Sequence, residues 1–141
     1  MAKYFLDTHV FYDFLTDDKD LDKRIKESIA NPKPKDIYVV SDFVMLEIIQ
    51  LKQLGKITLQ KGLKGLMELM ADYKIRCDKF DNAVWFKLDE IPMPKINKAM
   101  HSDPFDRVII AHCIQNKYTC ISADSKFPAY REFGLDLIEV S

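Results

Sequence analysis

The stretch that decides the fold is His101-Ser102-Asp103-Pro104-Phe105-Asp106-Arg107, which runs directly into the apolar segment Val108-Ile109-Ile110-Ala111. Asp followed by Pro is a strong helix start, because the Asp side chain caps the first turn and Pro fits its first position. We therefore expect a buried helix over residues 103–116. A second carboxylate in its first turn, Asp106, has less structural reason to be there, because Asp103 could cap the helix alone.

Segments typical of strands and helices alternate along the rest of the chain. We expect strands over residues 3–6, 37–40, 75–80, 118–122 and 136–140, and helices over residues 9–15, 21–30, 41–53, 58–73, 82–89 and 126–132. Such alternation is typical of an α/β fold, a three-layer sandwich with a mostly parallel central sheet flanked by helices. We interpret residues 1–141 as a single domain, with loops at the proline-containing stretches 31–35 and 91–95.

Composition places the chain among ordinary globular proteins, with 48% hydrophobic and 30% charged residues. Its net charge of −1 gives no general attraction for nucleic acid, so any contact with a polyanion must depend on local basic residues or bound cations. No apolar run approaches the roughly 20 residues of a membrane span, and the first residues lack a signal-peptide pattern. We therefore expect a cytoplasmic protein that does not enter a membrane, with its three cysteines reduced.

Three further acids occupy the edges of apolar segments. Asp7 directly follows the first expected strand, Glu47 interrupts an apolar helix, and Asp124 follows a later strand. Because ligands gather at the carboxyl ends of parallel strands, we expect these acids to lie near Asp106. Carboxylates that converge without matching bases suit a hard cation such as Mg²⁺ or Mn²⁺.

Each of these acids also has a purely structural interpretation. Asp7, Asp103 and Asp124 could each cap the helix that follows, and Glu47 could form an ion pair or reach solvent along the side of its helix. Capping accounts fully for Asp103 but less well for Asp106, which is the stronger metal candidate of the two. The sequence leaves open whether Asp103 is a ligand or only a cap.

Four segments follow one another in a diagnostic order over essentially the whole chain. They are Phe5-Leu6-Asp7-Thr8-His9-Val10, the helix that carries Glu47, Asp103-Pro104-Phe105-Asp106-Arg107-Val108-Ile109-Ile110-Ala111, and Ile121-Ser122-Ala123-Asp124. Together they resemble a PIN-domain ribonuclease, in particular the VapC-like toxins of bacterial toxin–antitoxin pairs. The resemblance implies a metal-dependent endoribonuclease that uses Mg²⁺ or Mn²⁺ and leaves 3′-hydroxyl and 5′-phosphate ends. It also implies a homodimer, inhibited by a cognate antitoxin protein that covers the acidic pocket.

The resemblance also assigns roles to individual residues. It implies a catalytic set of Asp7, Glu47, Asp106 and Asp124, and a metal-binding set of Asp7, Glu47, Asp106 and the accessory acid Asp103. The resemblance also implies that Thr8, the hydroxyl residue beside the first Asp, contacts the substrate. We add two predictions of our own for contacts with phosphate, which are Arg107 and Lys126. Apolar residues on the helices expected over 21–30 and 58–73 are candidates for contact with the antitoxin.

Two other functions have to be weighed against this hypothesis. A haloacid dehalogenase-like phosphatase also carries an Asp after its first strand, but it needs a second Asp two residues later, where this chain has His9. The other alternative is a catalytically weak PIN module that binds RNA or a protein partner without cutting. The sequence does not indicate which RNA is the substrate, or whether one or two metal ions bind.

Overall fold

A five-stranded parallel sheet forms the centre of the molecule, which we describe from a computed structural model for residues 2–140. The strand order is β3-β2-β1-β6-β7, and each neighbouring pair is parallel. The strands are β1 (Lys3–Leu6), β2 (Ile37–Ser41), β3 (Arg76–Asp78), β6 (Thr119–Ser122) and β7 (Asp136–Glu139). The expected α/β architecture with a parallel central sheet is confirmed.

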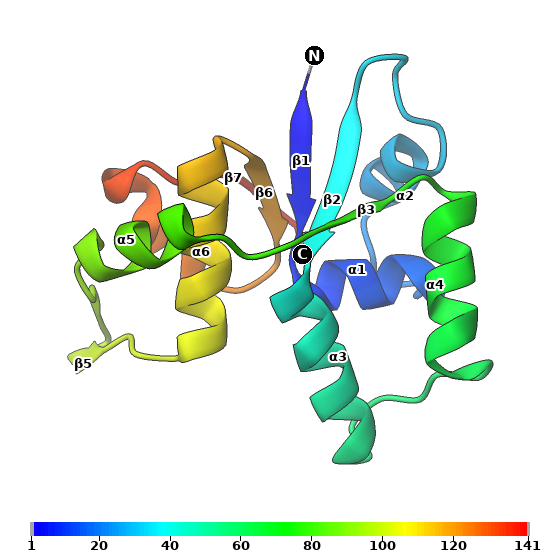
Figure 1. The fold of residues 1–141 in the computed structure, drawn as a ribbon, viewed down its shortest axis with the longest axis horizontal. Helices are drawn as coiled ribbons and strands as arrows, with labels where there is room; N and C mark the ends of the chain where they lie inside the picture. Colours follow the sequence, from blue (N-terminus) through cyan, green and yellow to red (C-terminus); the bar gives the residue numbers. More distant parts are fainter. Residues whose placement is uncertain (1, 141) are drawn as a thin grey trace.

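Helices flank this sheet, with α5 and α6 on one side of the strands and α1, α2 and α4 on the other (Figure 1). The helices are α1 (Thr8–Leu15), α2 (Lys23–Ala30), α3 (Asp42–Gln53), α4 (Gly62–Asp72), α5 (Asn82–Glu90), α6 (Pro104–Asn116) and the 3₁₀ helix η1 (Phe127–Phe133). The helix expected over residues 103–116 is confirmed as α6. Asp103 is its N-cap and Pro104 begins its first turn, as the sequence predicts.

The core is built where the central strands meet the buried part of α6. Phe5 and Leu6 of β1 and Val39 of β2 are fully buried, as expected for strands covered on both faces. All residues of α6 from Arg107 to Cys113 are buried as well. Each fully buried large apolar side chain contributes about 1.5–3 kcal/mol, so this central layer holds the strand ends in fixed positions.

The register of the sheet brings the ends of β1 and β6 together. Leu6 lies opposite Ile121, and the Asp7 amide donates a hydrogen bond to the Ile121 carbonyl at 3.1 Å. Side chains that follow these two strands therefore emerge at the same edge of the sheet. The arrowheads of β1 and β2 point to this edge, where α1 and α3 begin (Figure 1).

Two helices begin two or more residues later than the sequence predicts. The helix expected from residue 58 begins at Gly62, because a turn in which the Gly62 amide bonds to the Leu59 carbonyl precedes it. Gly62 has φ +66°, a left-handed conformation that glycine adopts without strain. The helix expected from residue 21 begins at Lys23, because the Asp22 side chain accepts a hydrogen bond from the Arg24 amide and caps it there.

A short antiparallel hairpin follows the proline-containing loop and was not expected. It consists of β4 (Lys95–Ile96) and β5 (Ala99–Met100). Its two turn residues, Asn97 and Lys98, have φ values of 52° and 69°, as the two central residues of a tight type I′ turn require. The short helix expected over 126–132 is a 3₁₀ helix, and the strand expected over 75–80 is confined to β3.

No helix within residues 2–140 has the length and apolar character needed to cross a membrane. The three cysteines are free thiols, with Cys113 and Cys120 buried and Cys77 exposed.

Candidate metal centre

Asp7 lies at the carboxyl end of β1 and is held by hydrogen bonds on both carboxylate oxygens. Its Oδ1 accepts from the Val10 amide at 3.0 Å, so Asp7 caps α1 as one interpretation of the sequence predicted. Its Oδ2 accepts from the hydroxyl of Ser122, at the end of β6. The side chain is fixed at the sheet edge, yet each oxygen keeps a lone pair for a further partner.

Burial raises the pKa of the Asp7 carboxyl to about 6. Only 5% of this residue is exposed, and the negative charge of Asp124 raises the pKa further, whereas the hydrogen bonds from Ser122 and Val10 oppose the shift. The ionised form therefore lacks sufficient positive charge around it. A cation beside Asp7 would favour that form.

The pKa of Asp106, at the start of α6, is raised for the same reasons. Burial raises its pKa to about 6, the neighbouring carboxylates of Asp103 and Asp124 raise it further, and contact with His101 opposes the shift. Its Oδ2 lies 3.1 Å from Nε2 of His101. It does not act as the helix cap, because Asp103 provides that function.

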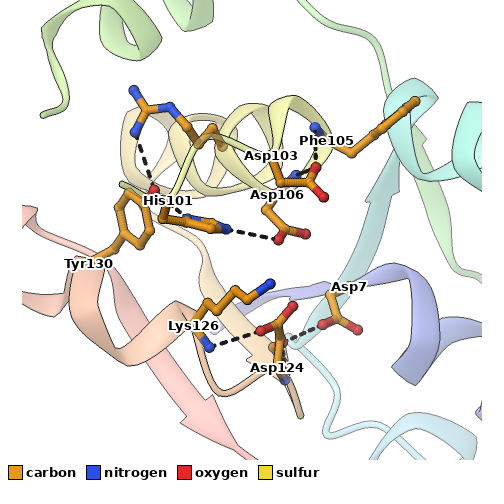
Figure 2. Close-up of polar contacts among 10 residues, drawn as sticks. Asp7, His101, Asp103, Phe105, Asp106, Asp124, Lys126 and Tyr130 are labelled. Atoms are coloured by element: carbon orange, nitrogen blue, oxygen red, sulfur yellow. Dashed lines mark hydrogen bonds and ion pairs between the residues drawn. The ribbon is translucent and has the colours of Figure 1, made fainter. Parts of the chain in front are cut away.

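Asp124 joins the other two acids through the loop after β6. Its amide donates to the Ser122 hydroxyl oxygen at 3.0 Å, and its Oδ1 accepts from the Lys126 amide at 2.8 Å. Asp7, Asp106 and Asp124 point toward a common region, and the side chain of Lys126 extends toward it (Figure 2). Asp124 raises the pKa of both other acids, which agrees with this arrangement.

Glu47 lies on the second turn of α3, beside the start of α1. Its Oε1 accepts a hydrogen bond from the hydroxyl of Thr8, which is buried directly next to Asp7. A hydroxyl group, not a base, is thus the partner of this half-buried Glu. The contact assigns Thr8 a role in holding Glu47, while a contact of Thr8 with substrate stays a prediction.

Asp103 is exposed and caps α6 as expected. Its Oδ1 accepts from the amides of Phe105 at 2.9 Å and Asp106 at 3.3 Å (Figure 2). The capping interpretation is confirmed. Metal ligation by Asp103 stays a prediction.

Arg107 is not placed to contact phosphate beside the acids. The residue is buried, and its guanidinium donates to the carbonyls of Leu88, Ile91 and Pro92 at 3.4, 2.8 and 3.2 Å. It also donates to the Tyr130 hydroxyl at 3.2 Å. A contact with substrate would leave these buried carbonyls without a donor, so the structure corrects the prediction for Arg107.

Three residues of the site have no role in the sequence prediction. Ser122 connects Asp7 with Asp124, and His101 connects Asp106 with Tyr130. The position of Ser122 at the end of a strand is a signal that could have identified it. Tyr130 gives no such signal, because it reaches the site from a helix far along the chain.

The carboxylates present fit a hard cation in their chemistry. Asp7, Glu47, Asp106 and Asp124 offer oxygen ligands, which Mg²⁺ and Mn²⁺ prefer. Within residues 2–140, no three His, Cys, Asp or Glu side chains are already close enough together to enclose an ion. Water or substrate oxygens would have to complete the coordination, as they commonly do for Mg²⁺.

Comparison with known proteins relates this geometry to a family. The sequence profile of the PIN domain matches residues 4–132. No curated protein sequence matches the chain. Among solved structures, a chain from VapBC2 of Rickettsia felis, bound to a DNA fragment from its promoter, has a TM-score of 0.73 and 17% identity, and covers 99% of this chain and 100% of that chain.

Two further structures are similar over their whole length. A chain of VapBC-1 from nontypeable Haemophilus influenzae has a TM-score of 0.74 and 16% identity, with 98% of each chain covered. A chain of DNA-bound VapBC from Salmonella typhimurium has a TM-score of 0.61 and 14% identity, and covers 99% of this chain and 98% of that chain. At such identities these likenesses concern the fold, whereas the profile match spans most of the sequence. The chain belongs to the PIN-domain family, and its fold is the one found in chains of VapBC complexes.

Proposed function

We propose that the chain is a Mg²⁺- or Mn²⁺-dependent endoribonuclease and the toxin of a type II toxin–antitoxin pair, acting on cytoplasmic RNA. The observation that carries this proposal is that Asp7, Asp106 and Asp124, from three separate elements, point toward a common region at one sheet edge (Figure 2). Their burial and mutual repulsion raise the pKa values of Asp7 and Asp106 to about 6. An arrangement that disfavours its own charges is expected where a cation is to be held.

The reaction would be hydrolysis of an RNA phosphodiester by water. A bound Mg²⁺ or Mn²⁺ supplies activation of the water and neutralisation of phosphate charge. The chain contributes carboxylates held by neighbours, with Asp7 bonded to Ser122 and Glu47 bonded to Thr8. We assign metal binding to Asp7, Glu47 and Asp106, with Asp103 as accessory ligand and Asp124 as the fourth catalytic acid.

RNA would extend from the acids toward the β4–β5 hairpin. A pocket of about 270 Å³ lies there, lined by the hairpin, Ser102, Asp103 and Lys126. Lys126 borders both this pocket and the acids, so we propose that it contacts a phosphate of the bound strand. Because the net charge gives no general attraction, this local lysine would matter for affinity.

The antitoxin would occupy a second and larger groove. It has a volume of about 520 Å³ and lies between α1 and α4, with Tyr12, Leu15, Leu66 and Leu69 among its lining residues. The similar solved structures are of VapBC assemblies, and one is described as a toxin–antitoxin complex from Klebsiella pneumoniae. Leu69→Arg should abolish co-purification with a coexpressed antitoxin, whereas the exposed control Lys33→Ala should retain it.

A homodimer is the last part of the proposal. Trp85 and Phe86 on α5 are 53% and 75% exposed, an unusual amount of aromatic surface for a monomer. A second copy of the chain would bury it. Sedimentation velocity should show a dimer for the wild type and a monomer for Phe86→Glu.

Cleavage of labelled RNA by purified protein tests the activity directly. We expect cleavage with Mg²⁺ or Mn²⁺, none with EDTA, and none by Asp7→Asn, with 5′-phosphate ends on the products. Asp36→Asn is a matched control, because Asp36 is a half-buried acid at the opposite end of the sheet, just before β2. Failure of folded, antitoxin-free protein to cut any of several RNA classes would favour the alternative, a PIN module that binds RNA or a partner without cutting.

A further inference from the structure

A chain of buried hydrogen bonds runs behind the Asp106 carboxylate. Arg107 Nη1 lies 3.2 Å from the Tyr130 hydroxyl, which lies 2.7 Å from His101 Nδ1. His101 Nε2 then lies 3.1 Å from Asp106 Oδ2 (Figure 2). His101, Arg107 and Tyr130 are all buried, although burying such polar groups is unfavourable unless each finds a partner.

Each donor in this series of hydrogen bonds donates toward Asp106. A guanidinium can only donate, so the Tyr130 oxygen accepts from Arg107 and its single proton is free for His101. A neutral imidazole that accepts at Nδ1 carries its proton on Nε2, directed at Asp106. This arrangement satisfies every group and fixes the tautomer of His101.

We propose that His101 is a positioning residue for the Asp106 carboxylate as a metal ligand, an inference that rests on the proposed nuclease function. By donating to Oδ2, His101 restricts rotation of a carboxylate that points toward the same region as Asp7 and Asp124 (Figure 2). Groups that orient metal ligands in this way commonly change metal affinity about 10–100-fold when they are removed.

The anchoring of Arg107 and Tyr130 explains how this series of hydrogen bonds holds the His101 imidazole in place. Arg107 is anchored by the carbonyls at the end of α5 and just beyond it, those of Leu88, Ile91 and Pro92. Tyr130 comes from η1 and is fully buried. The imidazole is therefore held by two elements that do not themselves contribute an acid to the site. A helix start alone would not require this arrangement, because Asp103 already caps α6.

The structure offers a matched control for a merely structural histidine. His112 is also buried, and its Nε2 lies 3.2 Å from Asp78 Oδ2, outside the group of acids. Loss of His101 removes the imidazole donor of Asp106, and loss of His112 removes one of two donors to Asp78, so either change should lower the melting temperature. Only loss of His101 should alter metal binding.

Calorimetric Mn²⁺ titration of the full chain, with melting temperature and RNA cleavage, tests the inference. We expect His101→Phe to raise the Mn²⁺ dissociation constant about tenfold or more. His101→Gln, whose amide nitrogen can replace Nε2 as donor, should stay within about threefold of wild type, as should His112→Phe. Tyr130→Phe, which frees the tautomer but keeps the imidazole, should weaken Mn²⁺ binding a few-fold and provides the test if His101→Phe does not fold.

The outcomes separate this inference from the nuclease proposal. If wild type binds Mn²⁺ and cleaves RNA while His101→Phe and Tyr130→Phe bind Mn²⁺ as wild type does, His101 is only structural and the inference is wrong. Equal weakening by His112→Phe would also overturn it. If wild type neither binds Mn²⁺ nor cleaves RNA, the proposed function fails and this inference fails with it.

Discussion

Two groups of His, Asp and Tyr lie near α6 and contain the same three residue types with different contacts between them. We refer to them as the site cluster (His101, Asp106 and Tyr130) and the support cluster (Asp78, His112 and Tyr118). In both, a buried imidazole Nε2 contacts one carboxylate oxygen, at 3.1 Å in the site cluster and 3.2 Å in the support cluster. The clusters differ in what the tyrosine contacts.

In the support cluster both other residues converge on the acid. The hydroxyl of Tyr118 and Nε2 of His112 meet at Asp78 Oδ2, and Arg76 lies 3.9 Å from Oδ1. In the site cluster the tyrosine contacts the histidine instead, so Asp106 has one imidazole donor and faces further carboxylates. The surroundings of the two acids thus differ: Asp78 lies among donors and near a guanidinium, whereas Asp106 faces other carboxylates. On the proposed function, only Asp106 would bind a cation.

The largest expected effect is that of removing each acid's charge. Asp106→Asn should lower RNA cleavage about 100- to 1,000-fold, because an amide is a poor ligand for Mg²⁺ and several kcal/mol of charge stabilisation are lost. Asp78→Asn should lower the melting temperature and keep cleavage within a few-fold of wild type. Single-turnover cleavage and thermal denaturation of both variants measure the difference, and equal loss of cleavage would contradict the distinction between the clusters.

The next effect is the pH dependence of the free energy of unfolding of the metal-free chain. The pKa of Asp7 is raised from 3.8 to about 6, so between these values the folded chain binds more protons than the unfolded chain. The free energy of unfolding therefore falls as pH rises through this window, by about 3 kcal/mol for Asp7 alone. Asp106, with its pKa also raised to about 6, adds to the fall in the same direction.

Denaturant unfolding at pH 4.5, 6 and 7.5, with and without Mn²⁺, measures this dependence. We expect Asp7→Asn to weaken the dependence of the free energy of unfolding on pH. The variant should also be more stable than wild type at pH 7.5 without metal. Mn²⁺ should raise the free energy of unfolding of the wild type above pH 6 and have little effect on it at pH 4.5. A wild-type chain that gains stability between pH 4.5 and 7.5 without metal would contradict a site of mutually repelling acids.

The alternation of strands and helices made the fold and much of this site predictable. Asp7 and Asp124 follow strands that end at one edge of a parallel sheet, and Asp106 lies in the first turn of the helix that packs beside them. Position along the chain was therefore enough to predict that these acids point toward one region of the sheet edge. Glu47 was identified because an acid among apolar helix residues needs a partner.

Side-chain contacts between distant segments were not predictable in this way. The partner of His101 is Tyr130, 29 residues away, and no spacing rule connects them. The sequence offers Arg107 as a candidate for phosphate contact, yet its guanidinium donates to carbonyls at the end of another helix and just beyond it. The β4–β5 hairpin was missed because Lys98 takes a left-handed conformation in which glycine is the usual signal.

A smaller effect is expected outside both clusters, at Lys126. Lys126→Ala should raise the KM for RNA about tenfold with little change in kcat, and should weaken the salt dependence of binding, because one phosphate contact is lost. Lys33→Ala, in an exposed loop remote in sequence from the acids, should change neither. Cleavage at several substrate and salt concentrations distinguishes this result from a loss of kcat, which would assign Lys126 to the chemistry instead.

The smallest effect should come from the tyrosine of the support cluster. Tyr118→Phe removes one of two donors to Asp78 Oδ2 while His112 remains, so the free energy of unfolding should fall by about 1 kcal/mol. Mn²⁺ affinity and cleavage should stay at wild-type values, in contrast to Tyr130→Phe. If Tyr118→Phe weakened Mn²⁺ binding as much as Tyr130→Phe does, the two clusters would be coupled through α6. In that case, the residue that each tyrosine contacts would not account for the proposed difference in cation binding between Asp106 and Asp78.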